Sequence, residues 1–215
     1  MTTSNALSRR AMHFNLLVLA FCVIAGHAEK AEAEAGLQTS SKDVWETYMK
    51  SDVYFLLRRT YQDPGSDSCR YARVLQRNEG NQSLLQLMGS YNKALKEYTK
   101  AKVYVTTRLG NNKERNHMGV SFLGYDVKPS IIYRLAFHDG NGCSLLKVTK
   151  DNRGVEKNLY GECELWATKE AAASINVMSS CEVAYFEKCN PNIRAEDTPY
   201  VTTCKDPPKD AESEA

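Results

Sequence analysis

Apolar and polar residues alternate along much of the chain between residues 53 and 149, and this is the pattern of short β-strands that bury one face. The alternating stretches are rich in β-branched and aromatic residues, and clusters of Gly, Asn, Asp and Pro separate them. With the segment CELWAT added, the pattern predicts eight strands, at 52–61, 69–76, 83–91, 98–109, 118–127, 131–138, 143–150 and 163–168.

One helix is predicted on each side of these strands. The segment 40–50 begins with Ser and Asp residues that suit a helix start, and it places Val44 and Tyr48 four residues apart. The segment 170–189 predicts a single amphipathic helix packed on the strands. Its apolar residues, three or four apart, are Ile175, Met178, Cys181 and Tyr185.

The order of these elements predicts an all-β fold. A long antiparallel meander leaves exposed edges unless it closes, so we expect an eight-stranded up-and-down barrel with an N-terminal and a C-terminal helix. A barrel of this size has room for one small ligand. The chain shows no internal repeat and no linker that would divide it, which predicts one domain.

The N-terminal segment has the features of a secretory signal peptide. Arg9 and Arg10 precede the short apolar run at 14–26, and small residues follow at Gly26 and Ala28. We therefore expect cleavage after Ala28, export of the product and a mature domain over 29–204. The polar, acidic segment 205–215 predicts a disordered tail.

Signal removal changes the charge balance. The chain has 28 Lys and Arg against 26 Asp and Glu, and residues 1–28 contain two Arg and no acid. The mature chain thus carries 28 − 2 = 26 basic and 26 acidic side chains. A net charge of zero gives no support for nucleic acid or an anionic membrane as a bulk electrostatic partner.

The cysteines indicate a disulfide framework. Of seven, Cys22 lies in the signal, and the remaining six in an exported chain predict three disulfides, for which about 15 connectivities are possible. With no C-x-x-C pair and only two mature histidines, His117 and His138, the sequence predicts no metal site. It also lacks the common nucleophile, metalloprotease, P-loop and dinucleotide motifs, so we expect a binding protein with no cofactor and no catalytic residue.

Two strands carry polar side chains that bear on ligand binding. In CELWAT, alternation puts Glu164 and Trp166 on one face, which is either a solvent face or the wall of a pocket. In IIYRLAFH, the mixed face that contains Arg134 would ordinarily meet water. In a ligand-holding barrel the apolar face could instead pack outward, and Arg134 would then lie inside and need an acidic partner or an anionic ligand. A further motif, NQS at Asn81, predicts N-glycosylation in a loop.

Together these features resemble the tick salivary lipocalins, whose best-known members are the histamine-binding proteins. The resemblance spans about residues 44–204 and rests on a Trp-containing first helix (DVWETYMK), a first strand that ends in Tyr and Asp-Pro, and a cysteine that opens the seventh strand (NGCSLLKV). The sequence E-L-W in the eighth strand and cysteines in the next helix and near the end complete it.

The resemblance implies a lipocalin barrel, specific cysteine pairs and a ligand site. The implied pairs are Cys69 with Cys204 and Cys143 with Cys181, which leaves Cys163 and Cys189 for a third bridge. In the amine-binding members, acids pair with the ligand ammonium and aromatic rings flank it. The matching residues in this chain are Tyr61, Asp63, Glu164 and Trp166.

Two positions depart from the amine-binding pattern. Ser144 follows Cys143 where amine binders have Asp, and Arg134 stands where they have an acid. The family implies a secreted, monomeric scavenger of a host inflammatory mediator, either histamine or serotonin through the residues above, or a leukotriene, thromboxane or fatty acid held through Arg134. A third possibility is a barrel scaffold whose loops bind a host immune protein.

Overall fold

The computed structural model describes residues 43–63, 68–111, 113–124, 128–176, 179–191 and 196–209. The predicted signal peptide and its cleavage site lie outside the described residues, as do the last six residues of the predicted tail. No helix of the described part is long and apolar enough to cross a membrane.

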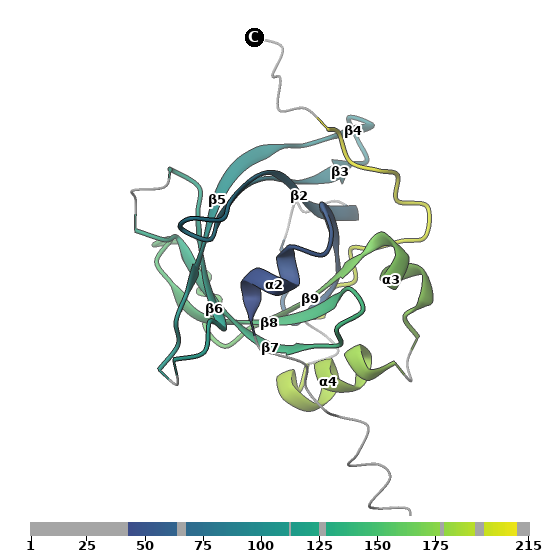
Figure 1. Ribbon diagram of the computed structural model, residues 1–215. Coiled ribbons are helices and arrows are strands. Elements are labelled where there is room, and N and C mark those ends of the chain that lie inside the picture. Colours follow the sequence, from purple (N-terminus) through teal and green to yellow (C-terminus); the bar gives the residue numbers. More distant parts are fainter. Residues whose placement is uncertain are drawn as a thin grey trace, which may run out of the picture. The chain divides into compact units, whose positions relative to one another are not determined.

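The strands form one antiparallel sheet that closes on itself (Figure 1). Each strand pairs with the next along the chain and the last returns to the first, which confirms the eight-stranded up-and-down barrel. The eight are β1 (Val53–Arg59), β2 (Ser68–Asn78), β3 (Ser83–Asn92), β5 (Ala101–Arg108), β6 (His117–Ser121), β7 (Ile131–His138), β8 (Cys143–Asp151) and β9 (Cys163–Thr168). The two-residue strand β4 (Glu97–Tyr98) only extends the end of β3.

Alternation along the strands sorts the apolar side chains into two clusters. In β1, Tyr54 and Leu56 belong to a cluster inside the barrel, whereas Phe55 and Leu57 belong to a second cluster outside it. The outer cluster exists because helices and the C-terminal segment cover part of the wall. Strands in this part of the barrel are therefore buried on both faces, as the fully buried β9 shows.

The N-terminal helix α2 (Val44–Tyr48) lies within the ring of strands in Figure 1. Asp43 caps it, because its Oδ1 accepts hydrogen bonds from the backbone N–H of Trp45 at 2.7 Å and of Glu46 at 3.3 Å. Val44, Trp45 and Tyr48 join the inner cluster. The Tyr54 hydroxyl donates to the carbonyl of Thr47 at 2.9 Å and ties the helix to β1.

The prediction of one helix over 170–189 is wrong, because the structure has two. Helix α3 (Lys169–Ser174) ends at the extended residue Ile175, and helix α4 (Ser180–Cys189) begins after Ser179, whose side chain accepts from the backbone N–H of Glu182 at 3.3 Å. Ser and Asn in this stretch compete for backbone hydrogen bonds and favour helix ends over helix interiors. Met178 lies outside the described residues.

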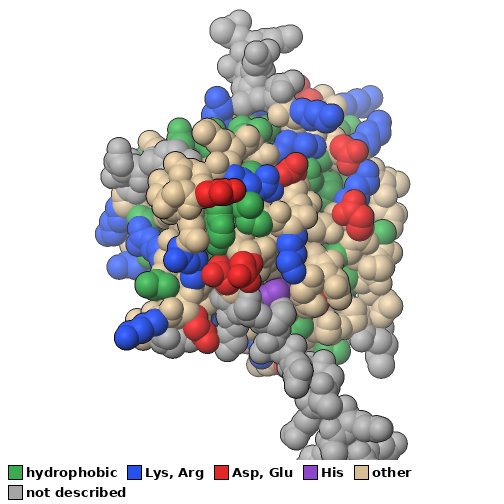
Figure 2. All heavy atoms as spheres, viewed as in Figure 1, with side chains coloured by type: hydrophobic (Ala, Val, Ile, Leu, Met, Phe, Trp, Pro, Cys, Tyr) green, Lys and Arg blue, Asp and Glu red, His purple; other side chains and the backbone are tan. Residues whose placement is uncertain are grey.

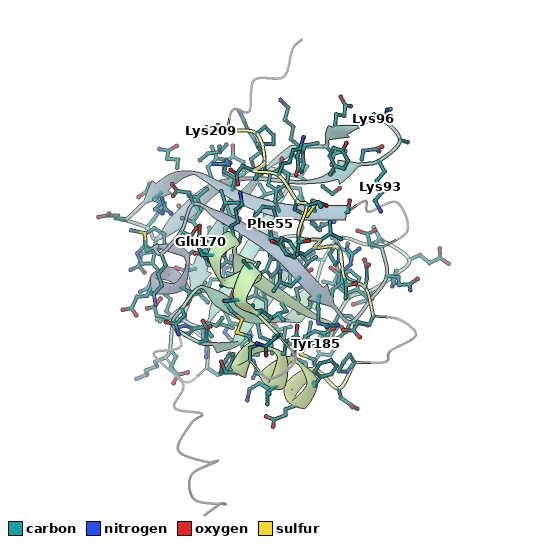
Figure 3. All side chains as sticks on the ribbon, turned by 90° about the vertical axis from the view of Figure 1, so that its right-hand side faces the viewer. Phe55, Lys93, Lys96, Glu170, Tyr185 and Lys209 are labelled. Atoms are coloured by element: carbon teal, nitrogen blue, oxygen red, sulfur yellow. A yellow bond between two sulfur atoms is a disulfide. The ribbon has the colours of Figure 1, made fainter. Side chains whose placement is uncertain are left out.

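Three disulfides attach the C-terminal part of the chain to the barrel. Their pairs are those that the family resemblance implied, Cys69 with Cys204, Cys143 with Cys181, and Cys163 with Cys189. Two of them join α4 to β8 and β9. Figure 3 shows α4, with Tyr185, and Phe55 of β1 on the same side of the barrel, consistent with their shared outer cluster.

The start of the predicted tail is ordered against the barrel, which corrects the expectation of disorder for residues 205–209. The Tyr98 hydroxyl donates to the carbonyl of Lys205 at 3.0 Å, and Lys169 forms a 2.7 Å ion pair with Asp206. The Arg73 guanidinium donates to the carbonyl of Pro207 at 2.8 Å. The disulfide at Cys204 holds the chain where these contacts can form.

The sequon residue Asn81 is exposed in the turn between β2 and β3, where its Oδ1 accepts from Ser83 Oγ at 2.6 Å. Its glycosylation stays a prediction.

Candidate ligand-binding site

A cavity of about 340 Å³ lies inside the barrel. Pockets for small molecules typically begin at about 300 Å³, so the volume suits one small ligand. Much of the wall is apolar, and β2, β3, β6, β7 and β8 each contribute apolar side chains to it. The apolar lining includes Ala72, Met88, Met118, Val120, Ile131 and Leu146.

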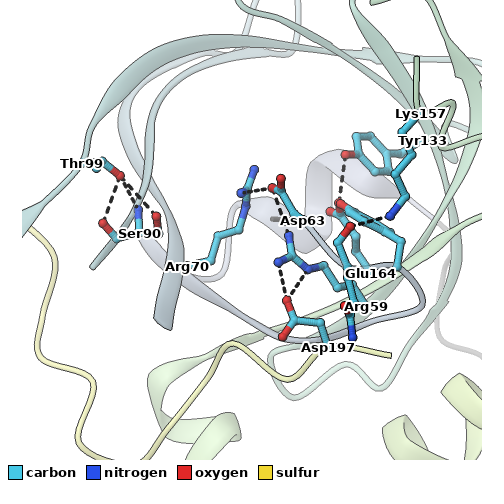
Figure 4. A network of polar contacts seen from close by, with 11 residues as sticks. Arg59, Asp63, Arg70, Ser90, Thr99, Tyr133, Lys157, Glu164 and Asp197 are labelled. Atoms are coloured by element: carbon cyan, nitrogen blue, oxygen red, sulfur yellow. Dashed lines mark hydrogen bonds and ion pairs between the residues drawn. The ribbon is translucent and has the colours of Figure 1, made fainter. Parts of the chain in front are cut away.

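Glu164 is the buried acid of this cavity, with 4% of its surface exposed. Its Oε1 accepts hydrogen bonds from the hydroxyls of Tyr61 and Tyr133, the latter at 3.2 Å. Its Oε2 accepts from the indole N–H of Trp166 at 2.8 Å. Figure 4 shows Tyr133 and Glu164 pointing toward each other.

Strand register brings these four side chains together. Alternation in β9 turns Glu164 and Trp166 inward and leaves Cys163, Leu165 and Ala167 in the outer cluster. Strand β8 lies between β9 and β7, with Leu146 opposite Glu164, so Tyr133 reaches Glu164 from two strands away. Tyr61 arrives from the end of β1, which pairs with β9.

The electrostatics of the cluster favour a cation. All three hydrogen-bond donors to Glu164 are neutral, and the described residues form no salt bridge with it. Burial raises the pKa values of the Tyr61 and Tyr133 hydroxyls well above the ordinary value for tyrosine, and the charge of Glu164 is the second largest cause. Both hydroxyls therefore stay protonated and donate, and the buried carboxylate forms no ion pair with a Lys or Arg of the described residues.

The rim of the cavity carries charges that are mostly paired. Asp63 contacts Arg59 at 3.4 Å and Arg70 at 3.3 Å, and Arg153 pairs with Asp151 at 2.7 Å. Figure 4 shows Asp63 between the two arginines. Two guanidinium groups thus already neutralise Asp63, which makes it a weaker partner for a ligand cation than Glu164.

Lys157 also lines the rim. Its Nζ donates to the carbonyl of Gln62 at 2.5 Å and lies 5.7 Å from the centre of the Tyr61 ring.

Of the five predicted ligand residues, the structure brings Tyr61, Glu164 and Trp166 into one cluster and places Asp63 at the rim. The structure corrects the expectation that Arg134 lies inside the barrel and binds a ligand. Arg134 is exposed on the outer face of β7 and does not line the cavity, whereas its neighbours Tyr133 and Leu135 lie in the inner cluster. Ile131, Tyr133 and Leu135 of β7 point inward and complete the apolar wall of the barrel, so Arg134, which alternates with them, points outward into water.

Sequence reasoning missed Tyr133 and Gln86. The signal for Tyr133 is its place in the alternating apolar face of IIYRLAFH, for which the sequence leaves an inward and an outward orientation open. Gln86 interrupts the apolar run SLLQLMG in β3, and such a polar residue on an inward face is a sign of a functional group. It is 3% exposed and lines the cavity, and among the described residues its Nε2 has no hydrogen-bond partner.

Among the described residues, one group of side chains has the composition of a metal site, namely Asp139, Cys143 and Cys181. The two cysteines form a disulfide, so neither offers a thiolate. Asp139 Oδ1 accepts from the backbone N–H of Asn141 at 2.8 Å and of Cys143 at 3.0 Å. These residues therefore build a turn and do not fit a metal ion.

Comparison with protein families gives one match, the family described as tick histamine binding protein, over residues 32–206. No curated protein matches the chain significantly. Several solved structures are similar. The AM182 serotonin complex is 19% identical, covering 73% of this chain and 86% of that chain, with a TM-score of 0.49.

Two further structures are similar at lower identity. Japanin from Rhipicephalus appendiculatus, solved with bound cholesterol, is 13% identical, covering 71% of this chain and 93% of that chain, with a TM-score of 0.48. The allergen Per a 4 from cockroaches is 14% identical, covering 77% of this chain and 94% of that chain, with a TM-score of 0.46.

Proposed function

Because the chain belongs to the tick histamine-binding protein family, we propose that it is a secreted lipocalin that sequesters a small biogenic amine, histamine or serotonin, without transforming it. One observation carries the proposal, namely the buried carboxylate of Glu164, whose hydrogen bonds all come from neutral donors. A ligand ammonium would supply the missing positive charge in a site shielded from water.

The surroundings of Glu164 support an aromatic amine. Tyr61, Tyr133 and Trp166 line the cavity beside the carboxylate, and a cation over the face of such a ring gains about 0.5 to 2 kcal/mol. The apolar wall accepts the rest of a small aromatic ligand. The alternative of an anionic lipid held through Arg134 has no support, because that side chain is exposed on the outer face.

The proposal is tested by calorimetric titration of the mature, oxidised protein with histamine, serotonin and a leukotriene. We expect at least one amine to bind. Glu164→Gln keeps the size of the side chain but removes its charge, so it should weaken amine affinity at least about 30-fold, which corresponds to about 2 kcal/mol. The matched control Arg134→Gln changes a charge outside the cavity and should leave affinity unchanged.

Thermal unfolding of each variant checks that the fold is intact. Saturable leukotriene binding without an amine response would contradict the amine proposal. Binding of neither ligand class would also contradict it and would favour the scaffold hypothesis, in which the loops bind a host protein.

A further inference from the structure

The outer face of strands β5 to β8 is basic although the chain as a whole is nearly neutral. The single acid in these strands is Asp151, whose side chain is 3% exposed and paired with Arg153. The strands carry five Lys and Arg residues, which are Lys102, Arg108, Arg134, Lys147 and Lys150.

Strand register aligns three cationic side chains and one histidine into one row. Arg108 of β5 stands opposite His117 of β6, and His117 stands opposite Arg134 of β7. Arg134 in turn stands opposite Lys147 of β8. We call these four residues the basic row. Neighbouring strands lie about 4.8 Å apart, so the row crosses four strands at that spacing.

Alternation places the whole basic row on the outside. The residues adjacent to it in sequence, such as Met118, Tyr133 and Val148, belong to the inner cluster. Arg108 and Arg134 are exposed. Within the described part of the chain, Arg108, Arg134 and Lys147 form no salt bridge.

Repulsion within the basic row destabilises the folded protein when no partner is bound. Like charges directly opposite each other on neighbouring strands destabilise a sheet, and Arg134 with Lys147 is such a pair. Burial, and then the charge of Arg134, lower the pKa of His117 below its ordinary value, so His117 also senses this positive potential. A bound polyanion would relieve the repulsion. Figure 2 shows several Lys and Arg side chains along the left edge of the molecule.

We propose that the basic row binds a linear sulfated polysaccharide. The row runs across the strands and therefore around the convex circumference of the barrel. A flexible polyanionic chain can follow this curve and contact successive cations, whereas a flat anionic membrane would touch only part of it. The proposal concerns the outer wall and is independent of the amine site.

The test is surface plasmon resonance with immobilised heparin hexasaccharide at physiological salt. The triple variant Arg108→Gln, Arg134→Gln, Lys147→Gln should lose about tenfold or more in affinity, and the slope of log affinity against log salt should become shallower. The control triple variant Lys93→Gln, Lys96→Gln, Lys209→Gln removes the same charge from exposed positions elsewhere and should bind like the wild type. Figure 3 shows Lys93 and Lys96 at the β3–β4 end.

Thermal unfolding of both triple variants reports whether the barrel is intact. No hexasaccharide binding by the wild-type protein, or an equal loss in the control variant, would overturn the proposal. Binding to vesicles that contain phosphatidylserine but not to the hexasaccharide would overturn it too, since the partner would then be a membrane.

Discussion

At the scale of single residues, two buried polar side chains that line the cavity, Glu164 and Gln86, differ in kind. Glu164 is an acid with three donors, whereas Gln86 on β3 offers an amide whose Nε2 has no partner among the described residues. A buried donor without a partner destabilises a protein by about 1 to 3 kcal/mol. A group of this kind is expected where a ligand completes the hydrogen bond.

Gln86 should therefore favour amines that carry a hydroxyl on the ring. We expect Gln86→Met to reduce serotonin affinity about five- to tenfold, equivalent to one neutral hydrogen bond of about 1 kcal/mol, and to leave tryptamine affinity unchanged. Calorimetric titration with both amines measures the difference. The unliganded variant should be as stable as the wild type or more so, because a costly buried amide is removed.

The exposed Gln76→Met serves as the control and should alter neither affinity. An equal loss of tryptamine and serotonin affinity in Gln86→Met would show that Gln86 only shapes the cavity.

The sequence predicts that Glu164 and Trp166 share a face, because a period of two needs no tertiary information. It does not predict which face of β7 points inward, since α4 covers part of the outer wall and apolar residues occur on both faces. The register of β7 against β8 also shifts between Leu135 and Phe137, and Phe137 joins the outer cluster. Tyr133 and Arg134 could therefore be assigned only from the closed barrel.

At the scale of elements, Asp151 organises the connection from β8 to β9, which forms part of the cavity rim. Its carboxylate accepts from Arg153 Nε at 2.9 Å and Nη2 at 2.7 Å, and from the backbone N–H of Leu159 at 2.9 Å. Arg153, Lys157 and Leu159 of this connection line the cavity. One carboxylate thus holds a whole segment of the binding site.

Asp151→Asn should reduce the free energy of unfolding by about 1 to 3 kcal/mol and weaken amine binding. Urea unfolding followed by Trp fluorescence measures the first effect, and calorimetry measures the second. Asp139→Asn is the matched control, because Asp139 caps the β7–β8 turn and does not line the cavity. It should lower stability without changing affinity, and equal affinity losses in both variants would contradict the assignment.

The contribution of Asp151 should depend on pH. Hydrogen bonds from Arg153, opposed by burial, lower the pKa of its carboxyl below the ordinary value of 3.8. A lowered pKa stabilises the fold above the unfolded-state pKa, and this stabilisation is lost as pH falls through the folded-state pKa. The stability difference between wild type and Asp151→Asn should therefore be constant from pH 7 to about pH 5 and should shrink below about pH 4.

Elements with a strong pattern are the ones that the sequence predicts well. The strands at 131–138 and 163–168 have the predicted bounds. The strand predicted at 118–127 ends at Ser121. The next residues, Phe122 and Leu123, are apolar but exposed, and their apolar character led to the prediction of a longer strand. The sequence did not predict the break between α3 and α4, because the helical spacing of apolar residues continues across the break. The signal for the break is Ser179, which caps the start of α4.

At the scale of the whole molecule, the bridge between Cys69 and Cys204 closes a loop of 135 residues. Replacing both cysteines by alanine should lower the free energy of unfolding by about 3 to 5 kcal/mol, because the unfolded chain gains conformational freedom. The Cys143–Cys181 bridge closes a loop of only 38 residues, so its removal should cost about 1 kcal/mol less. Urea unfolding of the two double variants tests the order, and the reverse order would contradict this account.

The three bridges end on β2, β8 and β9, and the strands β3, β5, β6 and β7 contain no cysteine. The barrel therefore has a covalently tied half and a half held by hydrogen bonds and packing alone. Backbone amides of β5 and β6 should exchange with deuterated water faster than those of β8 and β9. A ligand would then leave by transient opening of the untied half, so the lifetime of the complex would be set by the motion of strands other than β9, the strand that carries Glu164.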